Sequence, residues 1–145
     1  MKQWTFALLL LALIPSHFGC RQTSDLQKVI VHGKVSYDGE PIVNGQIYFY
    51  PTQDTQGPVS GAPIVDGSYL AEAKDGVPVG THLVKIEGFR VNGGGGGDML
   101  SNPGTGLPDQ YIPAQYNSAT TLEVVIPGDS RKLTKDFELA AVKHE

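Results

Sequence analysis

The sequence predicts an all-β protein, an antiparallel sandwich of seven strands that follows an N-terminal signal peptide. Three observations support this fold class. Apolar and polar residues alternate with a period of two in most segments after residue 28. Turn sequences separate these segments, in a chain that holds 18 glycines and 10 prolines. Between residues 28 and 140 there is no convincing apolar repeat of 3.6 residues, the pattern of an amphipathic helix.

The first predicted strand, 28–37, has an apolar row of Val29, Val31, Val35 and Tyr37 that Gly33 interrupts. The other strands are expected at 46–50, 59–65, 68–73, 81–87, 121–126 and 133–139. Turn residues follow the first strand at 38–41, and a hairpin turn is expected at 66–67, where glycine supplies a positive φ. The side chains predicted to point into the core are Val35, Ile47, Phe49, Val84, Val124 and Phe137.

Residues 1–19 have the features of a targeting segment. Lys2 precedes an apolar stretch of nine residues, 6–14, which is too short for the ~20 residues that a transmembrane helix needs. The chain's one cysteine, Cys20, comes next and follows Gly19. This arrangement resembles a bacterial lipobox, in which the cysteine is lipidated and becomes the mature N-terminus, although leucine is more usual where His17 stands. The alternative is a plain secretory signal followed by an incidental cysteine.

Lipidation of Cys20 would place the protein in the cell envelope, on the periplasmic or outer side of a membrane. Several acyl chains on one cysteine anchor a protein stably, whereas a single chain binds only marginally. Residues 20–27 are then a short tether, because the seven residues 21–27 extend to about 25 Å at most. The domain is expected to span 28–140, with a flexible glycine-rich loop at 91–110 and a tail at 141–145.

The domain contains one long opening motif and several shorter ones that follow it along the chain. The opening motif is Gly33-x-Val35-x-Tyr37-x-Gly39-x-Pro41-Ile42-x-x-Gly45-x-Ile47-x-Phe49-x-Pro51, and the later ones are Gly67-x-Tyr69, Gly76-x-Pro78-x-Gly80-x-His82-x-Val84, Ile112-Pro113-x-x-Tyr116 and 136–139. In these residues the domain resembles the carboxypeptidase regulatory-like, or transthyretin-like, β-sandwich of small bacterial lipoproteins. The family has an aromatic residue more often than histidine at the position of His82. The resemblance implies a seven-stranded Greek-key sandwich that is usually non-enzymatic and serves a structural or protein-interaction role.

A second class of function is a carbohydrate- or peptide-binding module that uses exposed aromatic residues. The candidates are Tyr48, Tyr50, Tyr111 and Tyr116, since a sandwich core has room for only some of them. A third possibility is an enzyme, because transthyretin-related hydrolases resemble this fold. Those hydrolases use paired histidines and end in a Tyr-Arg-Gly-Ser type tail, which this sequence lacks.

Other patterns predict no chemistry. The glycine run 93–97 is followed by Asp98 and not by the Gly-Lys-Ser/Thr of a phosphate-binding loop. The histidines His32 and His82 show no third ligand at a spacing typical of metal sites. The formal net charge is −4, so the composition does not indicate the positively charged surface that binds nucleic acid. We therefore expect no catalytic residues, no metal and no cofactor, and as partners a membrane and an envelope protein or glycan.

Overall fold

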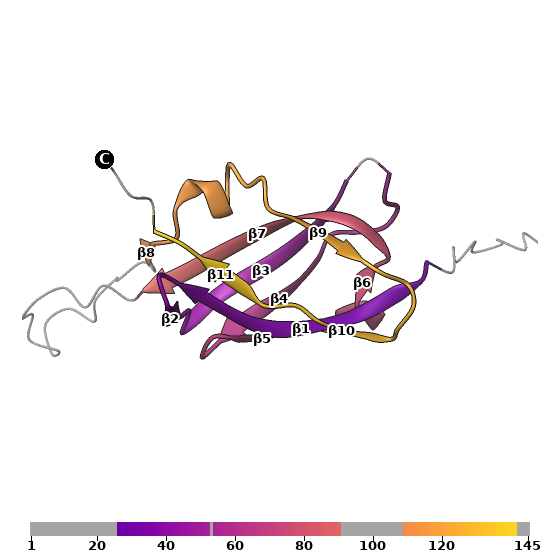
Figure 1. The fold of residues 1–145 in the computed structure, drawn as a ribbon, viewed down its shortest axis with the longest axis horizontal. Coiled ribbons are helices and arrows are strands. Elements are labelled where there is room, and N and C mark those ends of the chain that lie inside the picture. The colour runs from indigo at the N-terminus through magenta and orange to yellow at the C-terminus, as the bar shows by residue number, and fades with distance from the viewer. Residues whose placement is uncertain (1–25, 53, 91–108, 142–145) are drawn as a thin grey trace, which may run out of the picture.

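The computed structural model describes residues 26–52, 54–90 and 109–141 (Figure 1). The predicted signal peptide at 1–19, Cys20, most of the tether and loop residues 91–108 lie outside this part. The elements are β1 (Lys28–Tyr37), β2 (Glu40–Pro41), β3 (Asn44–Pro51), β4 (Ser60–Val65), β5 (Ser68–Ala71), the 3-10 helix η1 (Ala73–Asp75), β6 (Val77–Pro78), β7 (Gly80–Arg90), β8 (Asp109–Gln110), the 3-10 helix η2 (Ala114–Tyr116), β9 (Glu123–Ile126), β10 (Lys132–Thr134) and β11 (Phe137–Leu139). Among these described elements, no helix is long and apolar enough to cross a membrane.

The strands form one curled, mostly antiparallel sheet, as the sequence predicts for the fold class. In one part of it, β1 lies between the antiparallel strands β5, β2 and β6 on one side and the parallel strands β10 and β11 on the other. In the other part, β3 lies between β4 and β7, and β7 pairs in turn with β9 and β8. The β4–β5 hairpin joins the two parts.

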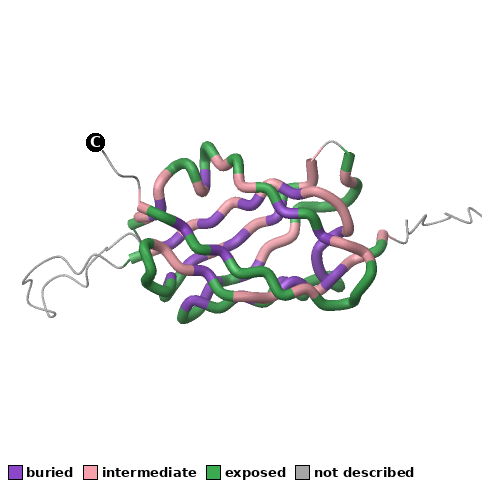
Figure 2. Tube along the Cα trace, in the orientation of Figure 1, coloured by how far each residue is buried: buried purple, intermediate pink, exposed green. Residues whose placement is uncertain are grey.

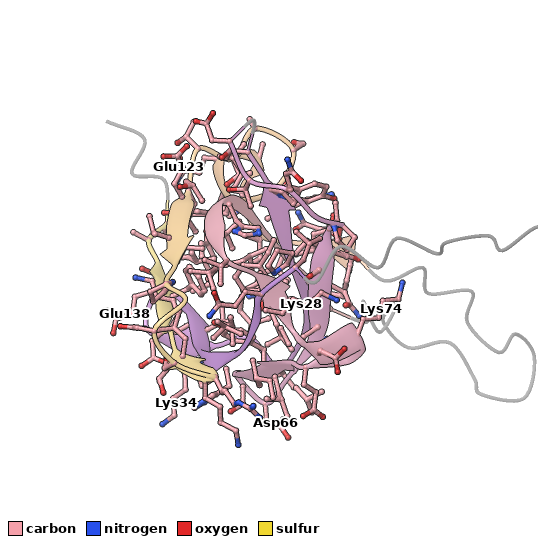
Figure 3. The ribbon with its side chains drawn as sticks, turned by 90° about the vertical axis from the view of Figure 1, so that its right-hand side faces the viewer. Lys28, Lys34, Asp66, Lys74, Glu123 and Glu138 are labelled. Carbon is pink, nitrogen blue, oxygen red and sulfur yellow. The ribbon has the colours of Figure 1, made fainter. Side chains whose placement is uncertain are left out.

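The inner face of the sheet encloses an apolar core (Figures 2 and 3). All six side chains predicted to point inward are buried, which confirms the predicted alternation. Phe49 and Ile47 come from β3, Val84 from β7 and Val35 from β1, so both parts of the sheet contribute. In the view along the strands, charged side chains such as Lys34 and Glu138 lie on the outside (Figure 3). Burial of this apolar surface is the main driving force for the fold.

Both predicted turns form as two-residue hairpins. Asp38 and Gly39 have φ values of 52° and 82°, and Asp66 and Gly67 have 48° and 72°. Two successive positive φ values define a type I′ turn, whose twist matches that of the flanking strands and which favours Asp-Gly. These turns fix the register of β1 with β2 and of β4 with β5.

Three sequence predictions are corrected. The single strand expected at 133–139 is split into β10 and β11 at Lys135 and Asp136, and both pieces run parallel to β1, so the sheet is not purely antiparallel. The segment 77–78, which lies between the strands predicted at 68–73 and 81–87, forms the additional strand β6 against the start of β1. The last two residues of the predicted loop, 109–110, form β8 against the end of β7.

The described chain enters and leaves the sheet at opposite ends. Leu26 and the start of β1 lie at one end, together with β6 (Figure 1). Arg90, Asp109 and the chain after β11 lie at the other end. Leu26 and the two residues that flank the segment 91–108 therefore lie at opposite ends of the domain.

Candidate binding surface

Tyr48 and Tyr50 lie side by side on the outer face of β3. Their positions follow from the strand alternation, because Ile47 and Phe49 point into the core. The two ring centroids are 6.3 Å apart with an interplanar angle of 50°. Tyr50 is 39% exposed and Tyr48 is half-buried. The strand therefore presents two neighbouring aromatic rings to solvent.

The next strand, β7, places Leu83 and Lys85 beside these rings, and Glu87 lies further along the same face, opposite Gln46. Leu83 is the cross-strand partner of Tyr50, and Lys85 is the partner of Tyr48. The Lys85 Nζ atom lies 5.9 Å from the centroid of the Tyr48 ring and 2.7 Å from Oε1 of Glu87. The hydrogen bond to Glu87 is the largest cause that raises the pKa of Lys85. We call Tyr48, Tyr50, Leu83, Lys85 and Glu87 the tyrosine face.

The third strand of this surface leaves room for the ring of Tyr48. Gly61 of β4 is the partner of Tyr48, and a β-carbon on Gly61 would lie 2.9 Å from Cδ1 of the tyrosine ring. The ring thus lies against the glycine and has no side chain facing it from that position. β3 also pairs with strands on both of its edges, so the platform under the rings is a continuous sheet.

Tyr111 and Tyr116 lie apart from this pair and pack against the core. The ring of Tyr111 contacts Tyr37 edge-on, with a centroid separation of 6.0 Å, and the Arg90 guanidinium lies 3.8 Å from its centroid. The Tyr116 hydroxyl donates to the Ala140 carbonyl at 3.2 Å and accepts from the Ala140 amide at 3.1 Å. Of the four candidate tyrosines, only Tyr48 and Tyr50 are brought together.

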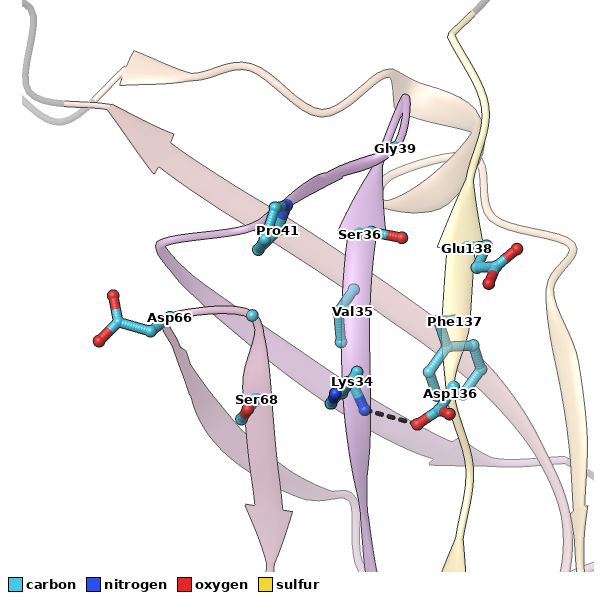
Figure 4. A pocket seen from close by; sticks show the side chains of 11 residues that line it. Lys34, Val35, Ser36, Gly39, Pro41, Asp66, Ser68, Asp136, Phe137 and Glu138 are labelled. Carbon is cyan, nitrogen blue, oxygen red and sulfur yellow. Dashed lines mark hydrogen bonds between the residues drawn. The ribbon is translucent and has the colours of Figure 1, made fainter.

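A cleft of about 270 Å³ lies between β1, the β4–β5 turn and β11 (Figure 4). Lys34, Asp66 and Asp136 contribute charged groups to its wall. Oδ1 of Asp136 accepts a hydrogen bond from the Lys34 amide at 2.7 Å, at the break between β10 and β11. The Asp136 carboxylate therefore has a structural role, because it accepts the hydrogen bond of the Lys34 amide where the strand pairing is interrupted.

The two strand histidines lie on opposite faces of the sheet. His32 points outward from β1, where Nε2 is 3.3 Å from Oγ1 of Thr134. His82 is fully buried, with Nδ1 3.2 Å from the Gly80 carbonyl oxygen and with no partner for Nε2 among the described residues. Burial lowers the pKa of His82, and the hydrogen bond to Gly80 opposes this shift. Within residues 26–52, 54–90 and 109–141, no group of three or more His, Cys, Asp or Glu side chains is arranged to hold a metal ion.

Sequence reasoning identified the two rings but not their neighbours. Leu83, Lys85 and Glu87 alternate with the buried Val84 and Ile86, which would have assigned them to the outer face. The neighbours of these three residues on β3 depend on the register between β3 and β7. No local sequence pattern gives that register. Comparison of the chain with protein-family models, curated proteins and solved structures finds no match.

Proposed function

We propose that this chain is a lipid-anchored cell-envelope protein whose non-enzymatic, transthyretin-like β-sandwich binds a partner through the tyrosine face. The proposal has four parts: the type of sandwich, the binding role, the non-enzymatic role and the anchor. Each part has its own support.

The strand connections support the sandwich. The strand order β4-β3-β7-β9 and the strand order β5-β1 with β10 and β11 form two groups that share one core. The chain passes from the first group to the second through the β4–β5 hairpin, and returns through the segment that leads to β7. This alternation between groups is typical of a Greek-key sandwich. The motif from Gly33 to Pro51 runs from the middle of β1 to the end of β3. β1 and β3 each pair with strands on both edges, so they are central strands of the two groups.

The binding role rests on one observation, the pair of tyrosine rings exposed on the outer face of β3. Tyr50 lies in a paired strand, yet its side chain is 39% exposed. Tyrosine offers a rigid apolar ring and a polar hydroxyl, which makes it common in binding surfaces. The remaining outward side chains of the tyrosine face include an ion pair and one leucine, so the surface offers both polar and apolar contacts.

The placement of the histidines supports a non-enzymatic role. A hydrolase of the transthyretin-related kind needs paired histidines in one site. His32 and His82 come from opposite faces of the sheet, and His82 is closed off from solvent. They have no common surface on which to act together.

The anchor rests on Cys20 and on the short connection to the domain. At most about 20 Å of extended chain separates Cys20 from Leu26, so the domain would stay close to the membrane with its Leu26 end toward the lipid. Cys20→Ser should abolish incorporation of a labelled fatty acid and move the protein to the soluble fraction. A serine variant that stays in the membrane fraction, or a wild-type protein that carries no acyl group on residue 20, would refute the anchor.

A further inference from the structure

His82 of β7 is fully buried beside β9, a strand at the edge of the sheet. We propose that His82 is an acid-sensitive switch: when its imidazole is protonated, β9 detaches from β7 while the rest of the sheet stays paired. This inference goes beyond the proposed function and does not depend on it. It follows from the surroundings of the ring, from the lack of a charged partner and from the pairing of β9.

The imidazole ring of His82 is enclosed by apolar side chains. The Phe49 ring lies edge-on to it, with the centroids 6.4 Å apart and an interplanar angle of 82°. The cross-strand partners of His82 are Pro51 on β3 and Val124 on β9. Nδ1 lies 3.2 Å from the Gly80 carbonyl oxygen, whereas Nε2 has no hydrogen-bond partner among the described residues. A proton added to Nε2 would therefore find no acceptor inside the fold.

No charged group in the core can compensate a charge on this ring. Among residues 26–52, 54–90 and 109–141, no Asp, Glu, Lys or Arg side chain is buried. Tyr69, which contacts the same Phe49 ring, is a phenol and stays neutral in acid. The titratable side chains of β3, β7 and β9 point outward or lie at a strand end, and they are Tyr48, Tyr50, Lys85, Glu87, Arg90 and Glu123. A buried charge without a partner is costly, so a protonated His82 favours any state in which the ring reaches water.

β9 is the neighbouring strand that can leave with the smallest loss of pairing. It is four residues long and, in the described part of the chain, pairs with β7 alone. On the other side of β7, β3 is eight residues long and pairs on both of its edges. Release of β9 breaks one set of strand pairs, whereas release of β3 breaks two. Val124 lies opposite His82, so departure of β9 uncovers this side of the histidine.

Hydrogen bonds on both sides of β9 can confine the release to this strand. Before it, the Val84 amide donates to the Leu122 carbonyl at 2.7 Å, and the Thr120 hydroxyl donates to the Val84 carbonyl at 2.7 Å. After it, the side-chain amide of Gln27 donates to the Gly128 carbonyl. The segments that flank β9 thus have attachments of their own, which do not include His82.

The direction of the pH effect follows from the two states of the ring. Burial lowers the pKa of His82 in the closed sheet, while a solvated histidine has a pKa of about 6.5. The open state therefore binds the proton more tightly and gains population as the pH falls below about 6.5. Between pH values of about 7.5 and 5.0, the equilibrium constant for opening of β9 should rise by up to about 30-fold.

Hydrogen–deuterium exchange of the full-length protein in detergent, followed by mass spectrometry, tests the switch. Exchange rates at both pH values are divided by the intrinsic rates at the same pH, which gives the opening constant of each strand. We expect the opening constant of β9 to rise with acid and to exceed that of β3 at both pH values. β11, which pairs with β1 and not with β7, should show no comparable rise. No rise in β9, an equal rise in β11, or equal opening constants in β9 and β3 would overturn the proposal.

Two variants separate titration from packing. His82→Phe keeps an aromatic ring but cannot be protonated, so the opening constant of β9 should be the same at both pH values. Val124→Ala is the matched control, because it loosens β9 and leaves His82 in place. It should raise opening about equally at both pH values and keep the wild-type ratio. A rise with acid that persists in His82→Phe would overturn the proposal, and the comparison of β9 with β11 in the wild type decides it if that variant does not fold.

Discussion

The carbonyl group of Lys135 occupies the space where Gly33 would carry a side chain. A β-carbon on Gly33 would overlap the Lys135 carbonyl oxygen, and the Lys135 carbonyl carbon would be only 2.6 Å away. The same oxygen accepts a hydrogen bond of 2.7 Å from the hydroxyl of Tyr69, the cross-strand partner of Gly33. β10 and β11 are separated at this point. The Lys135 carbonyl group lies in the space that Gly33 leaves free, and the Tyr69 hydroxyl donates a hydrogen bond to it there.

Gly33→Ala should therefore be strongly destabilising. The added methyl group meets backbone atoms, which cannot rotate away as a side chain would, and the segment 135–136 must shift. We expect a loss of about 2–4 kcal/mol in the free energy of unfolding, measured by urea denaturation. Gly39→Ala is the control, because Gly39 has a positive φ of 82° but a β-carbon there would meet nothing within 4 Å. It should cost only about 1–2 kcal/mol. Equal losses would show that the Lys135 carbonyl is not fixed against Gly33.

Tyr69→Phe removes the hydroxyl that satisfies the Lys135 carbonyl. The ring remains and keeps its contacts with Phe49 and Phe137, at centroid distances of 6.2 and 6.1 Å. This hydrogen bond is partly buried, and a buried acceptor left without its donor costs about 1–3 kcal/mol, so we expect a loss in unfolding free energy at the lower end of that range. Tyr37→Phe serves as the comparison, since Tyr37 is only partly buried at the edge of the core. A Tyr69→Phe protein as stable as the wild type would contradict the role of this hydrogen bond.

His82 should make the stability of the domain depend on pH. Its pKa is lowered, mainly by burial, so the folded state binds fewer protons than the unfolded state in mildly acidic solution. Stability is then complete above the unfolded pKa of about 6.5 and falls as pH decreases below that value. Urea denaturation at pH values of about 7.5 and 5.0, on either side of that pKa, measures the difference. His82→Phe removes this titrating group and should reduce the difference. An unchanged difference in His82→Phe would assign the effect to other groups.

Replacement of residues 92–106 by a short Gly-Ser linker should leave the domain folded. Arg90 and Asp109 are cross-strand partners at the ends of β7 and β8, so a short connection is sufficient to close the chain. The length of a loop affects stability by only ~0.6 kcal/mol per doubling. We expect a change in unfolding free energy below about 1 kcal/mol and unchanged ligand binding. A shortened protein that folds but no longer binds would make the segment the recognition element in place of the tyrosine face.

Local sequence patterns predict most of the strands but not how the last ones pair. The alternation in β1, β3 and β7 and the two Asp-Gly turns are local, and all of them form as expected. The split of the last strand is not local. It depends on Gly33, about a hundred residues earlier, and on the hydroxyl of Tyr69. The sequence shows an interruption in the apolar row at Gly33, but not which group fills the gap.

The sequence likewise predicts only part of the candidate site. Tyr48 and Tyr50 are two residues apart on one strand, so their common face follows from the alternation alone. Tyr111 and Tyr116 lie in a segment without periodicity, where no pattern indicates which way a side chain points. Their contacts with Arg90 and Ala140 arise only when the segment folds against the end of the sheet.

The central claim is that the tyrosine face meets a ligand in the cell envelope, and photocrosslinking in living cells tests it most directly. A benzophenone amino acid at Leu83, beside Tyr50, reacts with C–H bonds of whatever lies on this face. We predict a crosslinked adduct from position 83 that is lost when Tyr50→Ala is added, and no adduct from the same group at Leu70, which is 47% exposed on β5, outside the tyrosine face. Equal adducts from both positions, or an adduct at position 83 that persists without Tyr50, would contradict the claim.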